Sequence, residues 1–580
     1  MSQEIPNPCL VPFLIGVTGH RDIRAEDTSA LEAAVESVIR GFRTRLPSTP
    51  IIVLSGLAQG ADQLVARVAL RCGASLAAVL PMLEDTYRTT MDVSGRDGFD
   101  ELLPQAALVV RLPLVAGVSE EMLRQSEEAR AEQYEALAVF LAMYSQAVIA
   151  LWDGKASDAK GGTYCVIEYA LGNPPGSADS WAEPQSGIVY QVATPRQRDL
   201  ERLHKPFAVV IRTSLDPDKQ DDDADRRSLE MMLEAFNRDA IGCISAGNAS
   251  WGGLLPGQCT ASPTSFACRV GTVYGAADML SIRFGKQTKS TLMWILGLAL
   301  TAIGGFEIYA HVLRSHFGLW LIYPAALVGA WFVYRLTKER RIEKRYLDYR
   351  ALAEALRVQF FWNLAGIRES VADYYLVHHR TELDWIRNAL RAIRLFQLAE
   401  ADPLRGDESD MRLVQEQWIE DQRSFYEKTS KQQKKALERL EFTSIGSLRA
   451  VWILSLLIPA SLLVPWDGLS AWRNFASEEP WLGILILLTS LPSIAIGLFR
   501  VWIEQGGYAE QVRTYRRMAD VFKRADGRLD TELSPQDTES RVTRLKNARE
   551  VILHLGIQAL EENGDWLLLH RDRPIEIVGN

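Results

Sequence analysis

The residues whose types and spacing best suit ligand chemistry lie in three glycine-bearing loops, each of which follows an apolar run. The third loop follows the run over 147–151 and carries Asp153, Gly154, Gly161, Gly162 and Thr163. Glycine has no Cβ, so its backbone can lie against a ligand, and free N–H groups at a helix start attract anions. The loop therefore predicts a phosphate-binding turn. An ordinary strand-to-helix turn is the alternative interpretation.

The other two loops repeat the pattern earlier in the chain. The first follows the run over 12–17, and its candidate residues are Gly16, Thr18, Gly19, His20 and Arg21. The second follows the run over 51–54, and its candidate residues are Ser55, Gly56, Gln59, Gly60 and Asp62. Arg21 offers a fixed positive charge to a phosphate, while Asp62 can accept from a ribose hydroxyl or cap a helix. His20 alone also fits the role of a turn residue.

These loops need a fold that brings them together. Expected strands cover 12–17, 51–54, 75–80, 107–112, 147–151, 188–192 and 207–211, and expected helices cover 29–43, 63–72 and 119–144. Short apolar strands that alternate with helices predict a Rossmann-like, doubly wound, mostly parallel α/β sheet. Ligands bind such sheets beyond the carboxyl ends of the strands. All three loops are therefore predicted to face one crevice.

The ordered motifs Gly-Val-Thr-Gly-His-Arg (16–21), Leu-Ser-Gly-Leu-Ala-Gln-Gly-Ala-Asp (54–62) and Trp-Asp-Gly (152–154) followed by Gly-Gly-Thr (161–163) resemble the SLOG superfamily. This Rossmann-like group includes the lonely-guy phosphoribohydrolases, and the resemblance covers 10–215. It implies a pocket for a nucleotide derivative, such as a cyclic nucleotide or an ADP-ribose-like compound. Enzymes of the group carry Pro-Gly-Gly-x-Gly-Thr-x-x-Glu. Here the proline and third glycine are missing and the glutamate, Glu168, is displaced, so Glu168 is a catalytic candidate only if the chain is an enzyme.

Composition excludes some functions. A net charge of -9 argues against binding to polymeric nucleic acid, which normally needs a basic surface. The six cysteines form no Cys-x-x-Cys pair and are expected to be reduced thiols. The eight histidines show no His-Glu-x-x-His pattern, so neither a metal site nor a bound cofactor is expected.

Four long apolar runs in the second half predict two membrane hairpins. They cover 291–313 and 317–334, then 450–465 and 481–502. Buried helices of a large α-domain are the competing interpretation. Basic residues flank one side of the runs: Lys286, Lys289, Arg335, Lys338, Arg340, Arg341, Lys344, Arg345, Arg449 and Arg500. The positive-inside rule then places both termini and the sheet domain in the cytoplasm. The family resemblance implies a bacterial source and therefore the inner membrane.

A similar amphipathic helix is expected after each hairpin. Tyr349-Arg350-x-Leu352-Ala353-Glu354-x-Leu356-Arg357 matches Tyr515-Arg516-x-Met518-Ala519-Asp520-x-Phe522-Lys523. The match predicts an internal duplication, with chance similarity as the alternative. Further helices are expected at 381–398, 411–440 and 540–562. The expected domains are 1–215, a linker with a connecting helix over 216–288, and two hairpin modules over 289–444 and 445–580.

The hairpins with their Tyr-Arg-x-Leu-Ala-Glu helices resemble SLATT modules, two-span membrane modules that occur with SLOG sensors in bacterial antiviral defence. This resemblance implies a homo-oligomeric membrane effector that disrupts the bilayer or opens a pore when a nucleotide second messenger binds. Within the spans, Glu307 is expected to face protein, water or headgroups, and Gly297, Gly304 and Gly305 predict close helix packing. A membrane-tethered nucleotide N-glycosidase and a regulated transporter are the alternative functions.

Overall fold

The computed structural model describes residues 7–157, 159–172, 187–197, 205–213, 222–245, 254–255, 265–375, 380–400, 406–463, 481–505, 508–534 and 540–571. Several predicted segments lie outside these residues. They are the Pro- and Gly-rich loop over 173–186, the first part of the acidic run after 215, most of the loop over 246–265, and the acidic loop that contains Glu478 and Glu479.

The N-terminal part contains a seven-stranded sheet, in agreement with the predicted fold. Its strands are β1 (Phe13–Gly19), β2 (Ile51–Ser55), β3 (Ser75–Leu80), β4 (Leu108–Arg111), β5 (Ala147–Trp152), β6 (Ile188–Ala193) and β7 (Val209–Arg212). They lie in the order β4-β3-β2-β1-β5-β6-β7, and only β7 is antiparallel to its neighbour. The strands from β1 to β6 are almost wholly buried apolar runs, as expected for a sheet covered on both faces.

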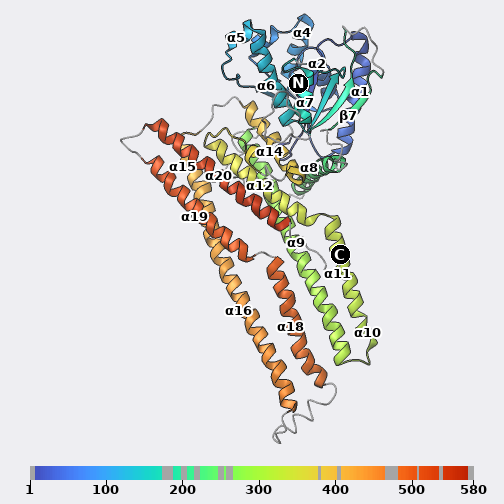
Figure 1. Cartoon of the computed structure of the whole chain (residues 1–580), viewed down its shortest axis with the longest axis vertical. Helices are drawn as coiled ribbons and strands as arrows, with labels where there is room; N and C mark the ends of the chain where they lie inside the picture. The colour runs from blue at the N-terminus through green and yellow to red at the C-terminus, as the bar shows by residue number, and fades with distance from the viewer. Residues whose placement is uncertain are drawn as a thin grey trace. The chain divides into compact units, whose positions relative to one another are not determined.

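Helices cover both faces of this sheet (Figure 1). They are α1 (Thr28–Arg45), α2 (Ala61–Arg71), α3 (Glu84–Arg88), α4 (Val93–Leu102), α5 (Glu120–Gln125), α6 (Glu127–Tyr144), α7 (Thr163–Leu171) and α8 (Asp222–Ser245). α2 packs against α1 and α4, while α6 packs against α7. Right-handed crossovers place the first group on one face and the second on the other.

The chain reverses its direction of travel through the sheet at β1. β2, β3 and β4 follow on one side of β1, whereas β5, β6 and β7 follow on the other. Ile15 pairs with Ala147 on β5, and Phe13 pairs with Ile51 on β2. The carboxyl ends of β1 and β5 therefore flank the topological switch point, where open α/β sheets bind their ligands.

The prediction of one continuous helix over 119–144 is wrong, because the helix is interrupted at Ser126 and forms α5 and α6. Ser126 has an extended backbone, and its hydroxyl accepts a hydrogen bond from the Ala129 amide at 3.3 Å. Ser119 caps the preceding helix α5 in the same way. Serine side chains compete with the helix for backbone N–H groups, which explains why the chain starts a new helix here.

The chain divides into two compact units. Unit 1 comprises 1–277, 352–360 and 369–404, and unit 2 comprises 278–351, 361–368 and 405–580. The boundary falls within α9 (Phe266–His311) and within α12 (Ile342–Leu364), so both helices contribute residues to both units. This division into two units does not test the predicted domain boundaries after residues 215, 288 and 444, which stay a prediction.

The remaining helices are α10 (Phe317–Trp320), α11 (Ile322–Glu339), α13 (Val371–Tyr374), α14 (Arg380–Ala399), α15 (Glu408–Val414), α16 (Asp421–Leu463), α18 (Trp481–Gln505), α19 (Tyr508–Leu533) and α20 (Arg541–Arg571). Four helices are long and apolar enough to cross a membrane, over 266–311, 317–364, 408–457 and 483–501. Their apolar stretches expose large side chains such as Trp294, Val328 and Trp452, as lipid-facing helices do. This agrees with a multi-pass membrane protein.

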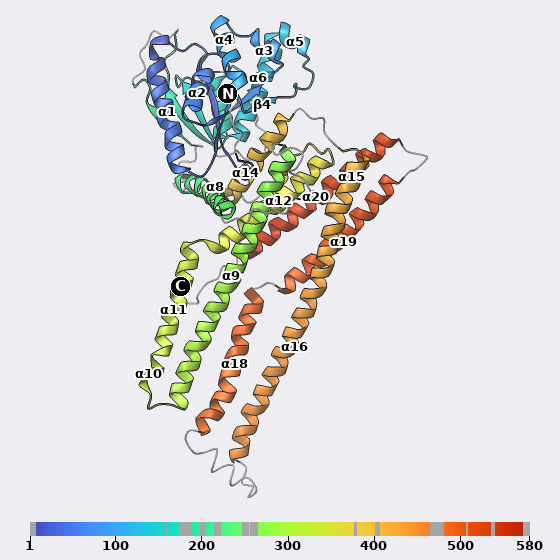
Figure 2. The ribbon, with the colours of Figure 1, turned by 180° about the vertical axis from the view of Figure 1, so that it is seen from behind.

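In unit 2, α16 lies beside both α18 and α19, as Figures 1 and 2 show from opposite sides. The predicted helix over 411–440 and the predicted third span form one continuous helical path, which contains a π-helical turn at Gln415–Glu420. Within that turn Trp418 stacks on Phe361, with ring centroids 5.3 Å apart. Burial of this tryptophan stabilises the wider turn.

The two matched amphipathic segments bury the same four positions of their shared frame. Tyr349, Leu352, Ala353 and Leu356 on α12 are buried, and so are Tyr515, Met518, Ala519 and Phe522 on α19. Each segment follows the second helix of a hairpin, and each hairpin begins with a helix of more than forty residues, α9 or α16. Equal positions, burial and order support the predicted duplication.

Glu307 lies at a contact between two spans of unit 2. Its carboxylate accepts a hydrogen bond from the Ser490 hydroxyl of α18 at 3.4 Å and lies 3.4 Å from the His311 ring. A Cβ at Gly304 would lie 3.4 Å from Leu491 of α18, and one at Gly305 would lie 2.9 Å from Ile322 of α11. The predicted close packing is confirmed at Gly304 and Gly305, and Glu307 faces protein. The prediction is wrong at Gly297, because a Cβ there would meet no atom of the described residues within 4 Å.

The expectation for the cysteines needs one correction. Cys9, Cys72, Cys165 and Cys243 are free thiols, but Cys268 is disulfide-bonded. A disulfide can form wherever two sulfurs meet in the fold, whatever their spacing in the sequence. The absence of a Cys-x-x-Cys motif therefore could not exclude it.

Asn237 of α8 ties this helix to the start of the sheet, and its replacement tests that connection. Its side chain is fully buried, accepts from the Val11 amide at 2.9 Å and donates to the Val11 carbonyl at 2.8 Å. Asn237→Ala leaves both buried backbone groups unpaired, so we expect destabilisation on the order of 2–4 kcal/mol. Denaturant unfolding followed by tryptophan fluorescence measures it. Gln105→Ala, which removes only an exposed bond, is the control, and an equal loss in both variants would contradict the assignment.

Candidate functional site

Backbone hydrogen bonds join the ends of the three loops at the switch point. The His20 amide donates to the Leu151 carbonyl at the end of β5 at 3.1 Å. The His20 carbonyl accepts from the Ala61 amide, at the start of α2, also at 3.1 Å. The first loop is therefore fixed between the second and the third. This geometry brings together the loops that the sequence predicts to share a crevice.

Gly60 makes this approach possible. Its φ of +87° lies in the region that favours glycine, and a Cβ there would lie 2.5 Å from the Arg21 carbonyl oxygen and 2.7 Å from that of His20. Any side chain would push the second loop away from the first. The glycine is required for packing between the loops, whether or not a ligand is bound.

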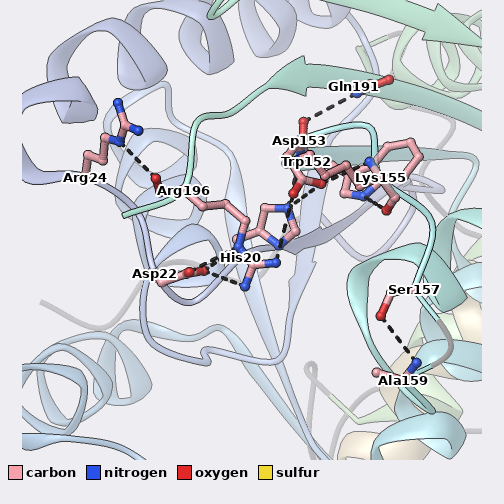
Figure 3. Close-up of polar contacts among 10 residues, drawn as sticks. All are labelled: His20, Asp22, Arg24, Trp152, Asp153, Lys155, Ser157, Ala159, Gln191 and Arg196. Atoms are coloured by element: carbon pink, nitrogen blue, oxygen red, sulfur yellow. Dashed lines mark hydrogen bonds and ion pairs between the residues drawn. The ribbon is translucent and has the colours of Figure 1, made fainter. Parts of the chain in front are cut away.

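A polar network lies on the β5 side of the switch point (Figure 3). His20 Nε2 lies 3.1 Å from both the Asp153 amide and an Asp153 carboxylate oxygen. Arg196, which follows β6, binds the Asp22 carboxylate through Nε at 2.9 Å and places Nη1 4.0 Å from Asp153. Arg24 donates to the Arg196 carbonyl at 2.9 Å. The network fixes the first loop to the loops after β5 and β6.

The charge state of this network follows from its burial. Burial lowers the pKa of His20, the charge of Arg196 lowers it further, and Asp153 opposes both effects. The ring is therefore neutral at pH 7, and its Nε2 can either accept from the Asp153 amide or donate to the Asp153 carboxylate. His20 Nε2 cannot do both at once, because it must lack a proton to accept from the Asp153 amide and must carry one to donate to the Asp153 carboxylate. A ligand that competes for Asp153 would decide between them.

A second group lies on the β2 side. Arg21 is exposed, and its guanidinium lies 5.4 Å from the centroid of the Tyr134 ring on α6. The Tyr134 hydroxyl is buried and makes no hydrogen bond within the described part of the chain. Its ring packs against Tyr87, with centroids 6.4 Å apart. Arg21 thus presents a charge above an aromatic pair that has an unused hydrogen-bonding group.

Asp62 completes this second group. It is 9% exposed and accepts from the Ala58 amide at 3.2 Å. Burial raises the pKa of Asp62 to about 7, although the Ala58 amide and the charge of Arg21 oppose the shift. A buried carboxylate that titrates near neutrality beside a cation is typical of a functional site. It can accept a hydrogen bond from a ligand hydroxyl or transfer a proton.

The third loop supplies an aromatic wall. Trp152 stacks on Tyr164 of α7, with centroids 5.9 Å apart, and the Arg212 guanidinium of β7 lies 5.2 Å from the Trp152 ring. Arg212 also donates to the Gln191 side chain at 2.6 Å. Gly154 follows with a φ of +86°. The sequence indicated the turn but not these partners.

Several predicted site residues serve the fold. Gly16 lies inside β1, opposite Leu54 and Val148, and Thr18 is buried in the same strand. The Ser55 hydroxyl bonds within its own turn, and the Gln59 amide bonds to Asp92. Gly19 packs against Ala61, and Gly56 packs near Asp62 and Tyr87. These residues shape the loops from within.

The helix start at 161–163 lies beside α6. A Cβ at Gly161, where φ is +68°, would lie 2.5 Å from the Tyr134 backbone, whereas one at Gly162 would meet nothing closer than 3.2 Å. Gly162 precedes α7, and its amide donates to the Ala159 carbonyl at 3.2 Å. The N–H groups that lack an intrahelical partner therefore begin at Thr163. Glu168 lies five residues further along α7, roughly 7.5 Å along the helix axis. It is one and a half turns away from the loops.

Seven further residues join the site: Asp22, Tyr87, Tyr134, Trp152, Tyr164, Arg196 and Arg212. Arg196 and Arg212 could have been predicted from two features of the sequence, their position and their residue type. Both lie next to predicted strands on the same side of the sheet, and arginine is the side chain that most often pairs with carboxylates and phosphates. No local signal distinguishes Tyr134 from other aromatic residues of an amphipathic helix.

No protein-family model matches the chain, and no curated protein matches it. Function must therefore be argued from the site itself, on a fold that hosts many activities.

A change at Asp62 tests the charge state of the crevice. The raised pKa means that ionised Asp62 destabilises the folded protein relative to the unfolded chain. This destabilisation is absent below about pH 4, where the carboxyl is protonated in both states, and it reaches its full size above about pH 7. Asp62→Asn removes this cost, so we expect its unfolding temperature to match the wild type near pH 4 and to exceed it by several degrees at pH 8. Thermal scans at several pH values measure the difference. A difference that does not change with pH would contradict the raised pKa.

The close approach of the third loop to α6 is tested by a matched pair of variants. Gly161→Ala combines a positive φ with a collision against the Tyr134 backbone, so we expect a loss on the order of 2 kcal/mol or more. Gly162→Ala, one residue away, keeps a negative φ and places its methyl group 3.2 Å from the Ala159 carbonyl oxygen, so we expect a smaller loss, on the order of 1 kcal/mol or less. Chemical denaturation compares them. Equal losses would show that the loop does not pack as described.

Proposed function

We propose that this chain is a ligand-controlled membrane effector. Its switch-point crevice binds a nucleotide-derived second messenger, and its four apolar helices respond by disrupting the bilayer or opening a pore. One observation carries the proposal: exposed Arg21 lies beside the buried carboxylate Asp62 and the unused Tyr134 hydroxyl, at the edge of the sheet where such folds bind ligands.

The chemistry of the crevice fits the two ends of a nucleotide. The guanidinium of Arg21 and the free N–H groups at the start of α7 suit a phosphate. Asp62 suits a ribose hydroxyl, and the half-buried Tyr164 ring, which packs on the buried Trp152, suits a base. The ligand is therefore proposed to be a cyclic nucleotide or an ADP-ribose-like compound. No polymeric nucleic acid is proposed, because the chain carries a net charge of -9.

α9 supports a link between ligand binding and the membrane. It is continuous from Phe266 in unit 1 to His311 in unit 2, and its apolar part is one of the four candidate spans. A continuous helix can transmit a displacement that a flexible linker would absorb. The ligand shifts the effector between two states only by its difference in affinity for them.

We further propose that the chain combines a SLOG-like sensor with two SLATT-like hairpins in bacterial antiviral defence, and that it acts as a homo-oligomer. The basic residues beside the spans support insertion in the inner membrane with both termini in the cytoplasm. The disulfide at Cys268 argues against a reducing compartment for unit 1. Labelling of Cys72 with a membrane-impermeant maleimide on intact cells decides between the two sides.

A membrane-tethered nucleotide N-glycosidase is the second candidate, because Asp62 titrates near neutrality in the crevice. The position of Glu168, more than a turn along α7, counts against the catalytic arrangement that the glutamate of the enzymatic motif would need. To separate the candidates, the full chain in nanodiscs is incubated with linear and cyclic nucleotides and ADP-ribose compounds, and bound species are identified by mass spectrometry. An intact ligand supports the sensor. A released base supports the glycosidase.

Replacement of Arg21 tests the crevice directly. Arg21→Gln removes the exposed charge, so we expect the affinity for the ligand retained in that experiment to fall on the order of tenfold or more. Arg88→Gln is the control, because Arg88 is an exposed arginine on the same unit that pairs with Asp100. Titration of the full chain in nanodiscs measures both. Unchanged affinity in Arg21→Gln would place the ligand elsewhere.

A further inference from the structure

The first hairpin carries a cluster of exposed cations at the end where the apolar stretches of both its spans stop. Its members are Lys286 and Lys289 on α9 and Lys338, Arg340 and Arg341 at the end of α11. None of these five side chains pairs with a carboxylate among the described residues, whereas the neighbouring Arg335 binds Glu339 at 2.8 Å. We call the five residues the basic patch. Their charges are available to a partner outside the chain.

Contacts between α9 and the segment that runs from α11 into α12 bring the two halves of the basic patch together. All of these residues belong to unit 2, and Figures 1 and 2 show α9 beside α11 from opposite sides. The hydroxyls of Thr291 and Thr337 lie 3.3 Å apart, and the rings of Phe284 and Tyr349 lie 5.7 Å apart between centroids. The two lysines of α9 lie between these contacts. They therefore share one end of the hairpin with the cations of α11.

Aromatic side chains on α11 mark the level of the lipid headgroups. The Arg335 guanidinium lies 5.3 Å from the centroid of the Trp331 ring, and the Lys338 ammonium lies 5.7 Å from that of Tyr334. Tryptophan and tyrosine gather at the boundary between hydrocarbon and water. Arg340 follows Tyr334 by six residues, roughly 9 Å along the helix. At physiological ionic strength a charged surface acts over about 8 Å, so the basic patch lies within reach of the headgroups.

The second hairpin lacks this cluster, although it follows the same plan. Tyr349 matches Tyr515 in the shared frame. In the same register, Lys338, Arg340 and Arg341 correspond to Glu504, Gly506 and Gly507. The positive-inside rule applies to both hairpins, so it does not explain why only one of them carries so many cations. The difference indicates a function of the first hairpin beyond its orientation.

We propose that the basic patch binds the headgroups of anionic phospholipids, and that the first hairpin gathers these lipids around it. The charges are complementary, because clustered lysines and arginines next to a span attract anionic headgroups. The basic patch also continues directly from two of the candidate spans, so it meets the membrane surface rather than a soluble partner. The proposal requires that the chain spans a membrane. It does not depend on the ligand proposed for the crevice.

The test measures which lipids stay bound to the full chain. The protein is placed in nanodiscs that contain equal amounts of phosphatidylglycerol and phosphatidylcholine, and native mass spectrometry counts the lipids that remain attached. We expect the wild type to retain phosphatidylglycerol preferentially. The combined change Lys338→Gln, Arg340→Gln and Arg341→Gln should lower this preference on the order of tenfold or more, because each cation near an anionic surface strengthens binding roughly fivefold.

A matched control removes the same charges elsewhere in unit 2. Lys523, Arg524 and Arg528 are exposed on α19, about four turns or more beyond its start. Their combined change to glutamine alters the net charge of the chain by the same amount. We expect this control to keep the preference for phosphatidylglycerol. Added salt should weaken the preference in the wild type and in the control, because it screens charges at the surface.

Two further variants keep the proposal testable if the triple variant does not insert. Lys286→Gln with Lys289→Gln removes charge from the α9 side and should lower the preference several-fold. Arg340→Lys with Arg341→Lys keeps the charges and should keep the preference. The proposal is overturned if neither neutral variant lowers the preference, or if the control lowers it equally. It is also overturned if inorganic phosphate, in phosphatidylcholine nanodiscs, raises the unfolding temperature only when the basic patch is intact, because the partner is then a soluble anion.

Discussion

The backbone of His20 is hydrogen-bonded on both sides, to the end of β5 through its amide and to the start of α2 through its carbonyl. This pair of bonds is possible because the sheet grows in both directions from β1, so that β1 has a parallel neighbour on each side. The side chains of the crevice depend on it. Arg21 faces Tyr134 on one side of His20, and the ring of His20 faces Asp153 on the other.

The close approach of the three loops explains why glycine stands at these positions better than contact with a phosphate alone does. Gly60 and Gly161 have positive φ and lie against backbone atoms of neighbouring segments, so both are needed to close the loops. Gly162 has a negative φ and a less severe contact, 3.2 Å to the Ala159 carbonyl oxygen, and it precedes the first turn of α7, where N–H groups suit an anion. The glycine motif in the sequence therefore combines two roles, packing and anion binding, that only the structure separates.

The strands, and the meeting of the three loops at one edge of the sheet, could be predicted because parallel strands are short apolar runs and their carboxyl ends meet at one edge. All seven expected strands are present. Tyr87 and Tyr134 could not be predicted as site residues, because their places depend on how distant segments cross the sheet. The break at Ser126 and the π-helical turn at Trp418 depend on one cap and one stacking contact. Such local contacts compete with propensities that alone favour an uninterrupted helix.

The apolar helices could be predicted from length and composition, and the repeated burial pattern on α12 and α19 supports their duplication. The contact between Glu307 and Ser490 was not predictable, because it joins residues 183 positions apart. The polar contact lies within an otherwise apolar region of unit 2. A conformational change of the apolar helices would therefore alter the packing of α9 against α18 at this contact.

The central claim is that occupancy of the crevice controls the membrane helices. The most direct measurement is release of a trapped dye from proteoliposomes of the full chain after addition of cyclic nucleotides and ADP-ribose compounds. The account predicts release with at least one of these compounds in the wild type and no release in Arg21→Gln at the same concentration. Release that is unchanged in Arg21→Gln, or no release with any compound that binds the crevice, would contradict it.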